Sequence, residues 1–279
     1  MLKDITLGQY YQEDSLIHRL DPRVKLVGTV VFMLSLFIFN NFICYTLGLL
    51  FLVCVIGMSK VPFRFMIKGM KSIFFLILIT VMYNLFLGTG DVLVEWKFIK
   101  ITWQGIETAF YMMTRLSLLI IGSSLMTLTT TPNQLTDGLE SLMKPLRLIR
   151  VPVHEVAMMM SIALRFIPIL MEETDKIMKA QIARGAAFES RNLIKKAKAL
   201  VPLLVPLIIS AFRRANDLSL AMEARCYRGG DSRTKMKPLR YAGRDVVAFI
   251  LLSLYLLGII VCGIFLEGSL VEIYKILTM

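Results

Sequence analysis

The sequence predicts an all-α integral membrane protein, with about five transmembrane helices and long cytosolic amphipathic helices between spans four and five. Composition is the first reason. Hydrophobic residues make up 56% of the 279 residues and charged residues 19%, whereas a soluble domain averages roughly 45–50% and 25%. The second reason is a set of long segments without charge. The third is the concentration of lysine and arginine in the remaining segments.

Segments that lack Asp, Glu, Lys and Arg mark the spans. Residues 26–59 are the longest, and as one helix these 34 residues would extend roughly 51 Å, well beyond a hydrocarbon core of about 30 Å. Asn40-Asn41 near the middle therefore predicts a tight turn between two antiparallel spans. Residues 73–90, 116–131 and 246–266 supply the other three, and the fourth extends back through Tyr111 with Arg115 inside it.

Lysine and arginine set the orientation. Twenty-eight of the 32 lie in residues 1–25, 58–72 and 132–245, which five spans and a cytosolic N-terminus place on one side. This satisfies the positive-inside rule and predicts a multi-pass protein of the cytoplasmic membrane. The predicted organisation begins with a cytosolic N-terminal segment (residues 1–25) and four transmembrane helices (26–131). A cytosolic helical segment (132–244), a fifth transmembrane helix (245–266) and an extracytoplasmic tail (267–279) follow.

Three helices are expected in the cytosolic segment. The first begins at Pro132, because proline is favoured in a first helical turn. The second runs from Pro152 to Arg184 with a kink at Pro168, and Gly185 supplies a natural stop.

The third helix begins between Ala199 and Pro206 and ends near Arg225. Its first ten residues are almost all apolar, which is too short to cross a bilayer. We expect them to lie in the membrane interface or to pack on another helix. The wide apolar faces of these cytosolic helices therefore need either lipid or another protein to cover them.

The second and third helices end alike. Ala183-Arg184-Gly185 and Ala224-Arg225-Cys226 each place an arginine between small residues at a helix C-terminus. One interpretation is electrostatic, because a cation there gains about 0.3–1 kcal/mol from the helix dipole. The other is docking: small neighbours let a rigid guanidinium enter a groove on another protein, where it binds carboxylates or carbonyls in fixed orientation.

Two further motifs are DSLIHRLDPRVKL at residues 14–26 and LRFIP at residues 164–168. Together with the paired arginine triplets, they make the chain resemble the transmembrane T component of energy-coupling factor (ECF) transporters, over nearly its whole length. In that family the first motif is the N-terminal hallmark. The second triplet departs from the family pattern by having Cys226 where glycine or another small residue is usual.

The resemblance implies a function and partners. An ECF T component joins two ABC-type ATPase subunits to a membrane S component that binds the substrate, for uptake of vitamins or other micronutrients. Its cytosolic coupling helices dock through two arginine tips. Carried over to this chain, the docking residues are Ala183, Arg184, Gly185, Ala224, Arg225 and Cys226, with Arg165 and Pro168 as possible supporting residues.

No cofactor is expected in this chain, and no enzymatic activity, catalytic residue or metal ligand. Gly69-Met70-Lys71-Ser72 lacks the glycine spacing of a phosphate loop, so ATP and Mg²⁺ would be bound and ATP hydrolysed by partner ATPases. The acidic residues at 172–175 are read as a solvated helix face, Arg115 as a snorkelling or structural residue, and His18 as structural. The formal charge of +12 is assigned to basic loops at an anionic membrane, and no nucleic acid partner is expected.

Two other classes stay open as alternatives. A self-sufficient secondary transporter would carry inverted repeats and charges near the membrane midplane. A membrane-embedded enzyme, such as an isoprenoid transferase, would need clustered acidic metal-binding motifs. Both would place functional residues inside the membrane, whereas the ECF interpretation places them at cytosolic helix tips.

Overall fold

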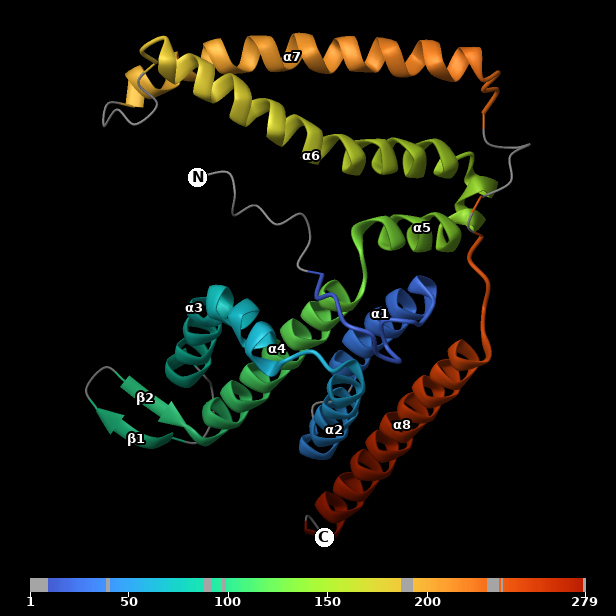
Figure 1. Ribbon diagram of the computed structural model, residues 1–279. Helices are drawn as coiled ribbons and strands as arrows, with labels where there is room; N and C mark the ends of the chain where they lie inside the picture. Colours follow the sequence, from blue (N-terminus) through green and yellow to red (C-terminus); the bar gives the residue numbers. More distant parts are fainter. Residues whose placement is uncertain are drawn as a thin grey trace. The chain divides into compact units, whose positions relative to one another are not determined.

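The computed structural model describes residues 10–38, 41–87, 92–96, 99–186, 193–229, 236 and 238–277. The chain divides into two compact units. We call Gly8–Gly138 with Leu239–Met279 the bundle unit, and Met1–Leu7 with Leu139–Pro238 the hairpin unit. The predicted all-α membrane class is confirmed, with one short β-hairpin added (Figure 1).

Each of the five predicted spans falls on its own helix of the bundle unit. These helices are α1 (Pro22–Ile38), α2 (Phe42–Ser59), α3 (Phe63–Leu87), α4 (Trp103–Thr129) and α8 (Gly243–Leu277). Helices α2, α4 and the Gly243–Ile264 part of α8 are long and apolar enough to cross a bilayer, and Ile73–Phe86 of α3 is a shorter apolar segment. The predicted turn between α1 and α2 falls partly on residues 39–40, which lie outside the described residues.

The outer surface of these helices is apolar. Leu50 of α2 exposes 68% of its surface, Phe75 of α3 71% and Leu254 of α8 68%. Exposed apolar side chains on several adjacent helices are unfavourable in water and favourable against lipid tails. The bundle unit is therefore built for a bilayer.

Three features of the bundle unit were not predicted. Helix α4 begins at Trp103, because the Thr102 hydroxyl accepts a hydrogen bond from the Gly105 N–H (3.1 Å) and caps the helix. Helix α8 continues to Leu277 through most of the predicted tail, since charged residues end a membrane span without ending a helix. An antiparallel hairpin, β1 (Val92–Trp96) with β2 (Ile99–Thr102), precedes α4.

Aromatic rings hold α1, α2 and α8 together. The rings of Phe51 and Tyr255 stack with centroids 4.3 Å apart, and Phe32 lies 6.0 Å from Phe51. The buried hydroxyls of Ser35 and Tyr255 hydrogen-bond to each other at 2.9 Å, so neither is left unsatisfied. A Cβ on Gly122 would lie 2.9 Å from the Phe32 ring, and the glycine thus permits close approach of α4 to α1.

Arg115 is a buried structural residue, one of the two roles expected from the sequence. Its Nε and Nη2 both donate to the Tyr45 hydroxyl of α2, at 2.9 and 2.6 Å. Its guanidinium carbon lies 5.1 Å from the centroid of the Phe37 ring of α1, a cation–π contact. One arginine therefore joins three helices inside the bundle unit.

Helix α5 (Pro132–Leu142) starts where Pro132 predicts and leads out of the bundle unit. Thr131 and Gln134 cap it reciprocally: the Thr131 hydroxyl accepts from the Gln134 N–H (3.3 Å), and the Gln134 side chain accepts from the Thr131 N–H (3.2 Å). The 3₁₀ helix η1 (Lys144–Ile149) follows.

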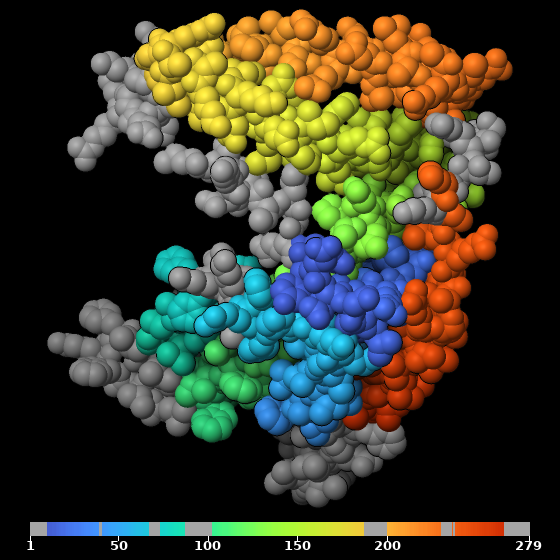
Figure 2. All heavy atoms as spheres, in the orientation of Figure 1, coloured from blue at the N-terminus to red at the C-terminus, as the bar shows by residue number. Residues whose placement is uncertain are grey.

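The hairpin unit is dominated by two long antiparallel helices, α6 (Val153–Ala183) and α7 (Leu193–Ala224) (Figure 1). Figure 2 shows their side chains in contact. Glu173 of α6 accepts hydrogen bonds from the Ser210 hydroxyl (2.5 Å) and from Arg214 Nη2 (2.9 Å), both on α7. The acidic residues of α6 are thus not uniformly solvated, because Glu173 joins the two helices.

Helix α7 starts earlier than predicted. It begins at Leu193 and contains Pro202 and Pro206 in its interior, whereas the sequence analysis took this proline region as the helix start. Pro206 has no N–H to offer the Pro202 carbonyl one turn back. Gln181 of α6 donates its Nε2 to that carbonyl instead, at 3.4 Å, and a contact between helices thereby compensates for the proline.

Helix α6 has the predicted extent, and Pro168 lies midway along it. In Figure 1 the helix changes direction along its length, as expected of an interior proline. Part of α6 also meets the length and composition criteria for crossing a membrane. It nevertheless belongs to the hairpin unit with α7, and its second half is charged.

Candidate functional site: two arginine-capped helix ends

Both arginine triplets form the same helix cap. At the end of α6, the Gly185 N–H donates to the Ile182 carbonyl (2.9 Å) and the Ala186 N–H to the Gln181 carbonyl (3.0 Å). These two bonds define a Schellman motif with Arg184 at the C-cap and Gly185 in the left-handed conformation, at φ +88°. The motif satisfies carbonyls that the helix end would otherwise leave without donors.

The end of α7 repeats this geometry. The Cys226 N–H donates to the Glu223 carbonyl (2.8 Å) and the Tyr227 N–H to the Met222 carbonyl (3.0 Å). Cys226 has a φ of +53° and stands where α6 has glycine. A side chain at positive φ is strained. A Cβ on Gly185 would meet no atom of the described part of the chain within 4 Å, so backbone conformation and not lack of space favours glycine at this position.

The arginines themselves are available to a partner. Arg184 and Arg225 are both exposed. Within the described part of the chain, neither guanidinium takes part in a side-chain hydrogen bond or an ion pair. Only their backbones are bonded at the cap. The Arg184 N–H donates to the Ala180 and Gln181 carbonyls, and the Arg225 N–H to the Ala221 and Met222 carbonyls.

The two arginines lie at opposite ends of the helix pair. The helices run antiparallel, so the C-terminus of α6 and that of α7 point in opposite directions (Figure 1). With 31 and 32 residues, each helix is on the order of 45–50 Å long. The structure therefore makes two similar sites on one helix pair, and does not bring the two triplets together.

The two supporting candidates lie elsewhere. Arg165 and Pro168 are both exposed and sit near the middle of α6, roughly 25 Å along the helix from Arg184. They do not contribute to either cap. A supporting role for these two residues stays a prediction.

The N-terminal hallmark forms a clasp at one end of the bundle unit. Asp21 is the N-cap of α1, its side chain accepting from the Arg23 N–H (2.9 Å). The fully buried Asp245 carboxylate accepts from the Asp21 N–H (2.9 Å) and from the Ala242 N–H (2.7 Å). One carboxylate thus ties the start of α1 to the start of α8.

Lys25 and His18 extend the clasp. Lys25 Nζ donates to the His18 carbonyl (3.0 Å) and the Thr129 carbonyl (2.8 Å), which adds the end of α4. The His18 ring contacts the Ser15 hydroxyl through Nδ1 (2.7 Å) and the Tyr11 carbonyl through Nε2 (3.0 Å). Burial lowers the pKa of His18, favouring the neutral ring. These contacts make His18 a structural residue.

Asp245 was given no role from the sequence, and Glu173 was assigned to a solvated helix face, whereas both join elements of the structure. Asp245 occupies the first turn of α8, where an acidic residue interacts well with a helix N-terminus, and this position was its only sequence signal. Within the described ranges, no three His, Cys, Asp or Glu side chains are grouped so that they could hold a metal ion.

Known proteins match the chain along most of its length. The family model described as cobalt transport protein (CbiQ) matches residues 13–236. The energy-coupling factor transporter transmembrane protein EcfT of Clostridium kluyveri is 57% identical over 250 residues, covering 89% of this chain and 93% of that protein. The chain belongs to the EcfT family of ECF transporter transmembrane proteins.

Other EcfT proteins agree. That of Thermosediminibacter oceani is 51% identical over 257 residues, 92% of this chain and 97% of the relative. That of Bacillus subtilis is 45% identical over 257 residues, 91% and 97%. The relatives are named as transmembrane components of a transporter and not as enzymes. The EcfT name, with the apolar helices described above, makes this a multi-pass membrane protein and a component of a multi-subunit transporter.

Proposed function

We propose that this chain is the energy-coupling subunit of an ATP-driven ECF importer, and that it joins two ABC-type ATPase subunits to a substrate-binding S component. The substrate is a vitamin or another micronutrient, such as the metal ion named in the family description. ATP and Mg²⁺ are bound by the ATPases and not by this chain.

One observation carries the proposal: two helix caps with the same hydrogen-bond pattern each present an exposed arginine that, among the described residues, makes no side-chain hydrogen bond or ion pair. Two equivalent sites at the two ends of one helix pair suit two equivalent partners. A motion of either partner would then be transmitted along a helix pair that Glu173 and Gln181 hold together. The helix dipole explains a cation at each end but gives no reason for two matched small-residue surroundings.

The proposal places the N-terminus and the hairpin unit in the cytosol. It is supported by the basic residues, of which twenty lie between 132 and 245. Exposed apolar side chains on α7, including Phe212 at 69% and Leu220 at 65%, support a protein partner for the same helices, because such surface is unfavourable in water.

The test is charge reversal at both tips. Arg184→Glu with Arg225→Glu should abolish co-purification of co-expressed ATPase subunits and substrate uptake, while membrane insertion is retained. Lys179→Glu with Arg213→Glu is the matched control, since both are exposed cations on the same helices and the charge change is equal. Normal ATPase binding and uptake by the arginine double variant would refute the docking role.

Single variants separate docking from the dipole effect. Each arginine should contribute on the order of 2–5 kcal/mol to ATPase affinity if its charge is desolvated in a groove. A titration that finds under about 0.5 kcal/mol for both would favour the electrostatic interpretation. Uptake by the isolated chain in vesicles would favour a self-sufficient transporter.

A further inference from the structure

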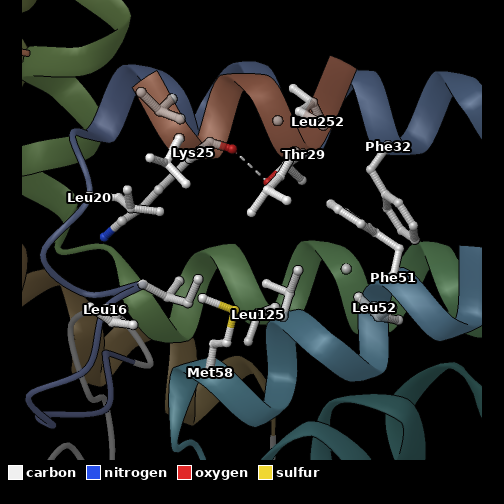
Figure 3. Close-up of a pocket in the computed structure, with 18 of the residues that line it drawn as sticks. Leu16, Leu20, Lys25, Thr29, Phe32, Phe51, Leu52, Met58, Leu125 and Leu252 are labelled. Carbon is white, nitrogen blue, oxygen red and sulfur yellow. Dashed lines mark hydrogen bonds between the residues drawn. The ribbon is translucent and has the colours of Figure 1, made fainter. Parts of the chain in front are cut away.

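A cavity of about 350 Å³ opens within the bundle unit, between α1, α2, α4, α8 and the turn that precedes α1 (Figure 3). All of these elements contribute residues from one end of the bundle: the starts of α1 and α8 and the ends of α2 and α4. This is the end that carries the Asp21–Asp245 clasp. The volume lies within the range of about 300–1,000 Å³ found for small-ligand sites.

The cavity is apolar along most of its length. Phe32 and Phe51 lie at one end, and Leu52, Met58 and Leu125 line one side (Figure 3). Among the described residues that line it, only Thr29 carries a hydroxyl, which donates to the Lys25 carbonyl at 2.8 Å. Such a wall offers little hydrogen bonding to a polar ligand and suits a hydrocarbon chain.

The opposite end of the cavity is cationic. Lys25 and Arg244 both line it, and the Lys25 ammonium lies near Leu20, away from the two phenylalanines (Figure 3). Lys25 donates to two neutral carbonyls, while the nearby Asp21 and Asp245 carboxylates accept backbone N–H groups. Arg244 is exposed and, among the described residues, makes no side-chain hydrogen bond or ion pair.

The cations coincide with the membrane boundary. Lys25 directly precedes the first predicted span, and Arg244 lies two residues before the uncharged part of the fifth. The cavity therefore extends from the headgroup region into the hydrocarbon. Basic pockets between transmembrane helices at this depth bind anionic lipid headgroups.

We propose that this cavity binds one acyl chain of an anionic phospholipid, whose phosphate is held by Arg244. The aromatic end receives the chain, and the guanidinium binds phosphate oxygens in its planar fork. The bound lipid would fill the space between α1 and α8 beneath the clasp. Lipid binding requires no ATPase, so it stands or falls independently of the docking proposal.

The experiment titrates the full-length protein with phosphatidylglycerol or phosphatidylcholine of equal chain length and counts bound lipids by native mass spectrometry. The first phosphatidylglycerol should bind about tenfold more tightly than phosphatidylcholine. Arg244→Gln should reduce that preference at least fivefold. Arg240→Gln, also exposed and without a side-chain partner among the described residues, is the matched control and should keep the preference.

A second pair of variants tests the cavity itself. Gly28 lines it, and Gly28→Leu should abolish the tight first binding of both lipids. Gly57→Leu is the control, because a Cβ on Gly57 meets nothing within 4 Å and the residue faces outward on α2. Where Gly28→Leu does not fold, the Arg244→Gln comparison still decides.

Two results would overturn the proposal. One is equal affinity of the unaltered protein for the two lipids, or a preference for phosphatidylglycerol that Arg244→Gln leaves unchanged. The other is unchanged lipid binding by Gly28→Leu accompanied by lost association with an S component, which would assign the cavity to a protein partner.

Discussion

Substitutions at the left-handed positions of the two caps should change local stability in opposite directions. Gly185→Ala puts a Cβ at φ +88°, and Cys226→Gly removes one at φ +53°. The left-handed conformation costs a residue with a side chain about 1–2 kcal/mol. Glycine makes the unfolded chain more flexible than alanine does, which offsets about 0.4–1 kcal/mol of this difference. Each substitution should therefore change local stability by about 1 kcal/mol.

Amide hydrogen exchange measures this change at the cap itself. A difference of 1 kcal/mol in the opening free energy corresponds to roughly a fivefold change in exchange rate. Amides of residues 184–186 should exchange about fivefold faster in Gly185→Ala. Those of residues 225–227 should exchange about fivefold more slowly in Cys226→Gly. A Cβ on Gly185 would have no atom of the described residues within 4 Å, so steric clash does not enter the expected value.

Cys226→Ala is the control, because it removes the thiol and keeps the Cβ. Its exchange rate should match that of the unaltered protein. Two results would show that backbone strain is not the reason for glycine in the motif. One is a shift of the amide exchange rate in the same direction for Gly185→Ala and Cys226→Gly. The other is equal protection of the cap by Cys226→Ala and Cys226→Gly.

Three further outcomes are expected. Asp245→Ala leaves the Asp21 and Ala242 N–H groups without their acceptor and should destabilise the bundle unit by about 2–5 kcal/mol in thermal unfolding. The control Glu13→Ala removes an exposed carboxylate of the same unit and should change its stability by less than about 0.5 kcal/mol. Equal midpoints for the two variants would disprove the clasp. The hydrogen bond from Ser210 and the neighbouring Arg214 lower the pKa of Glu173 below its usual value of 4.5. The contribution of Glu173 to stability is therefore present above pH 4.5 and is lost as the pH falls through the lowered pKa of the folded state. Glu173→Gln should flatten the acid side of the stability profile. In cells that express this chain without ATPase subunits, a membrane-impermeant maleimide should label Cys226, which is exposed outside the spans, in inside-out vesicles and not in intact cells. The reverse pattern would invert the proposed orientation.

The caps were predictable because their signals are local. Pro152 and Gly185 bound α6 closely, since a proline at a start and a glycine at an end act through the backbone of a few residues. The two arginines were found the same way, by their position beside small residues. The left-handed conformation of Cys226 carried no such signal, because cysteine is not typical of that region.

Other features depend on residues far apart in the chain. Asp245 meets Asp21 across 224 positions, and Glu173 meets Arg214 across 41. Neither pair is visible in a sequence pattern of single helices. The start of α7 was wrong for the same reason: the donor that allows the helix to continue through Pro206 comes from Gln181 on α6.

That bond to the Pro202 carbonyl also fixes how far one long helix lies along the other. In an uninterrupted helix each interior carbonyl is already used by its own ladder and is not offered to a neighbouring helix. The Pro202 carbonyl, which Pro206 leaves without a ladder donor, is an acceptor for the neighbouring helix at one defined position of α7. Sliding α6 by one turn, about 5.4 Å, would take Gln181 away from the Pro202 carbonyl. This hydrogen bond therefore helps to fix the distance between the cap of α6 and the cap of α7.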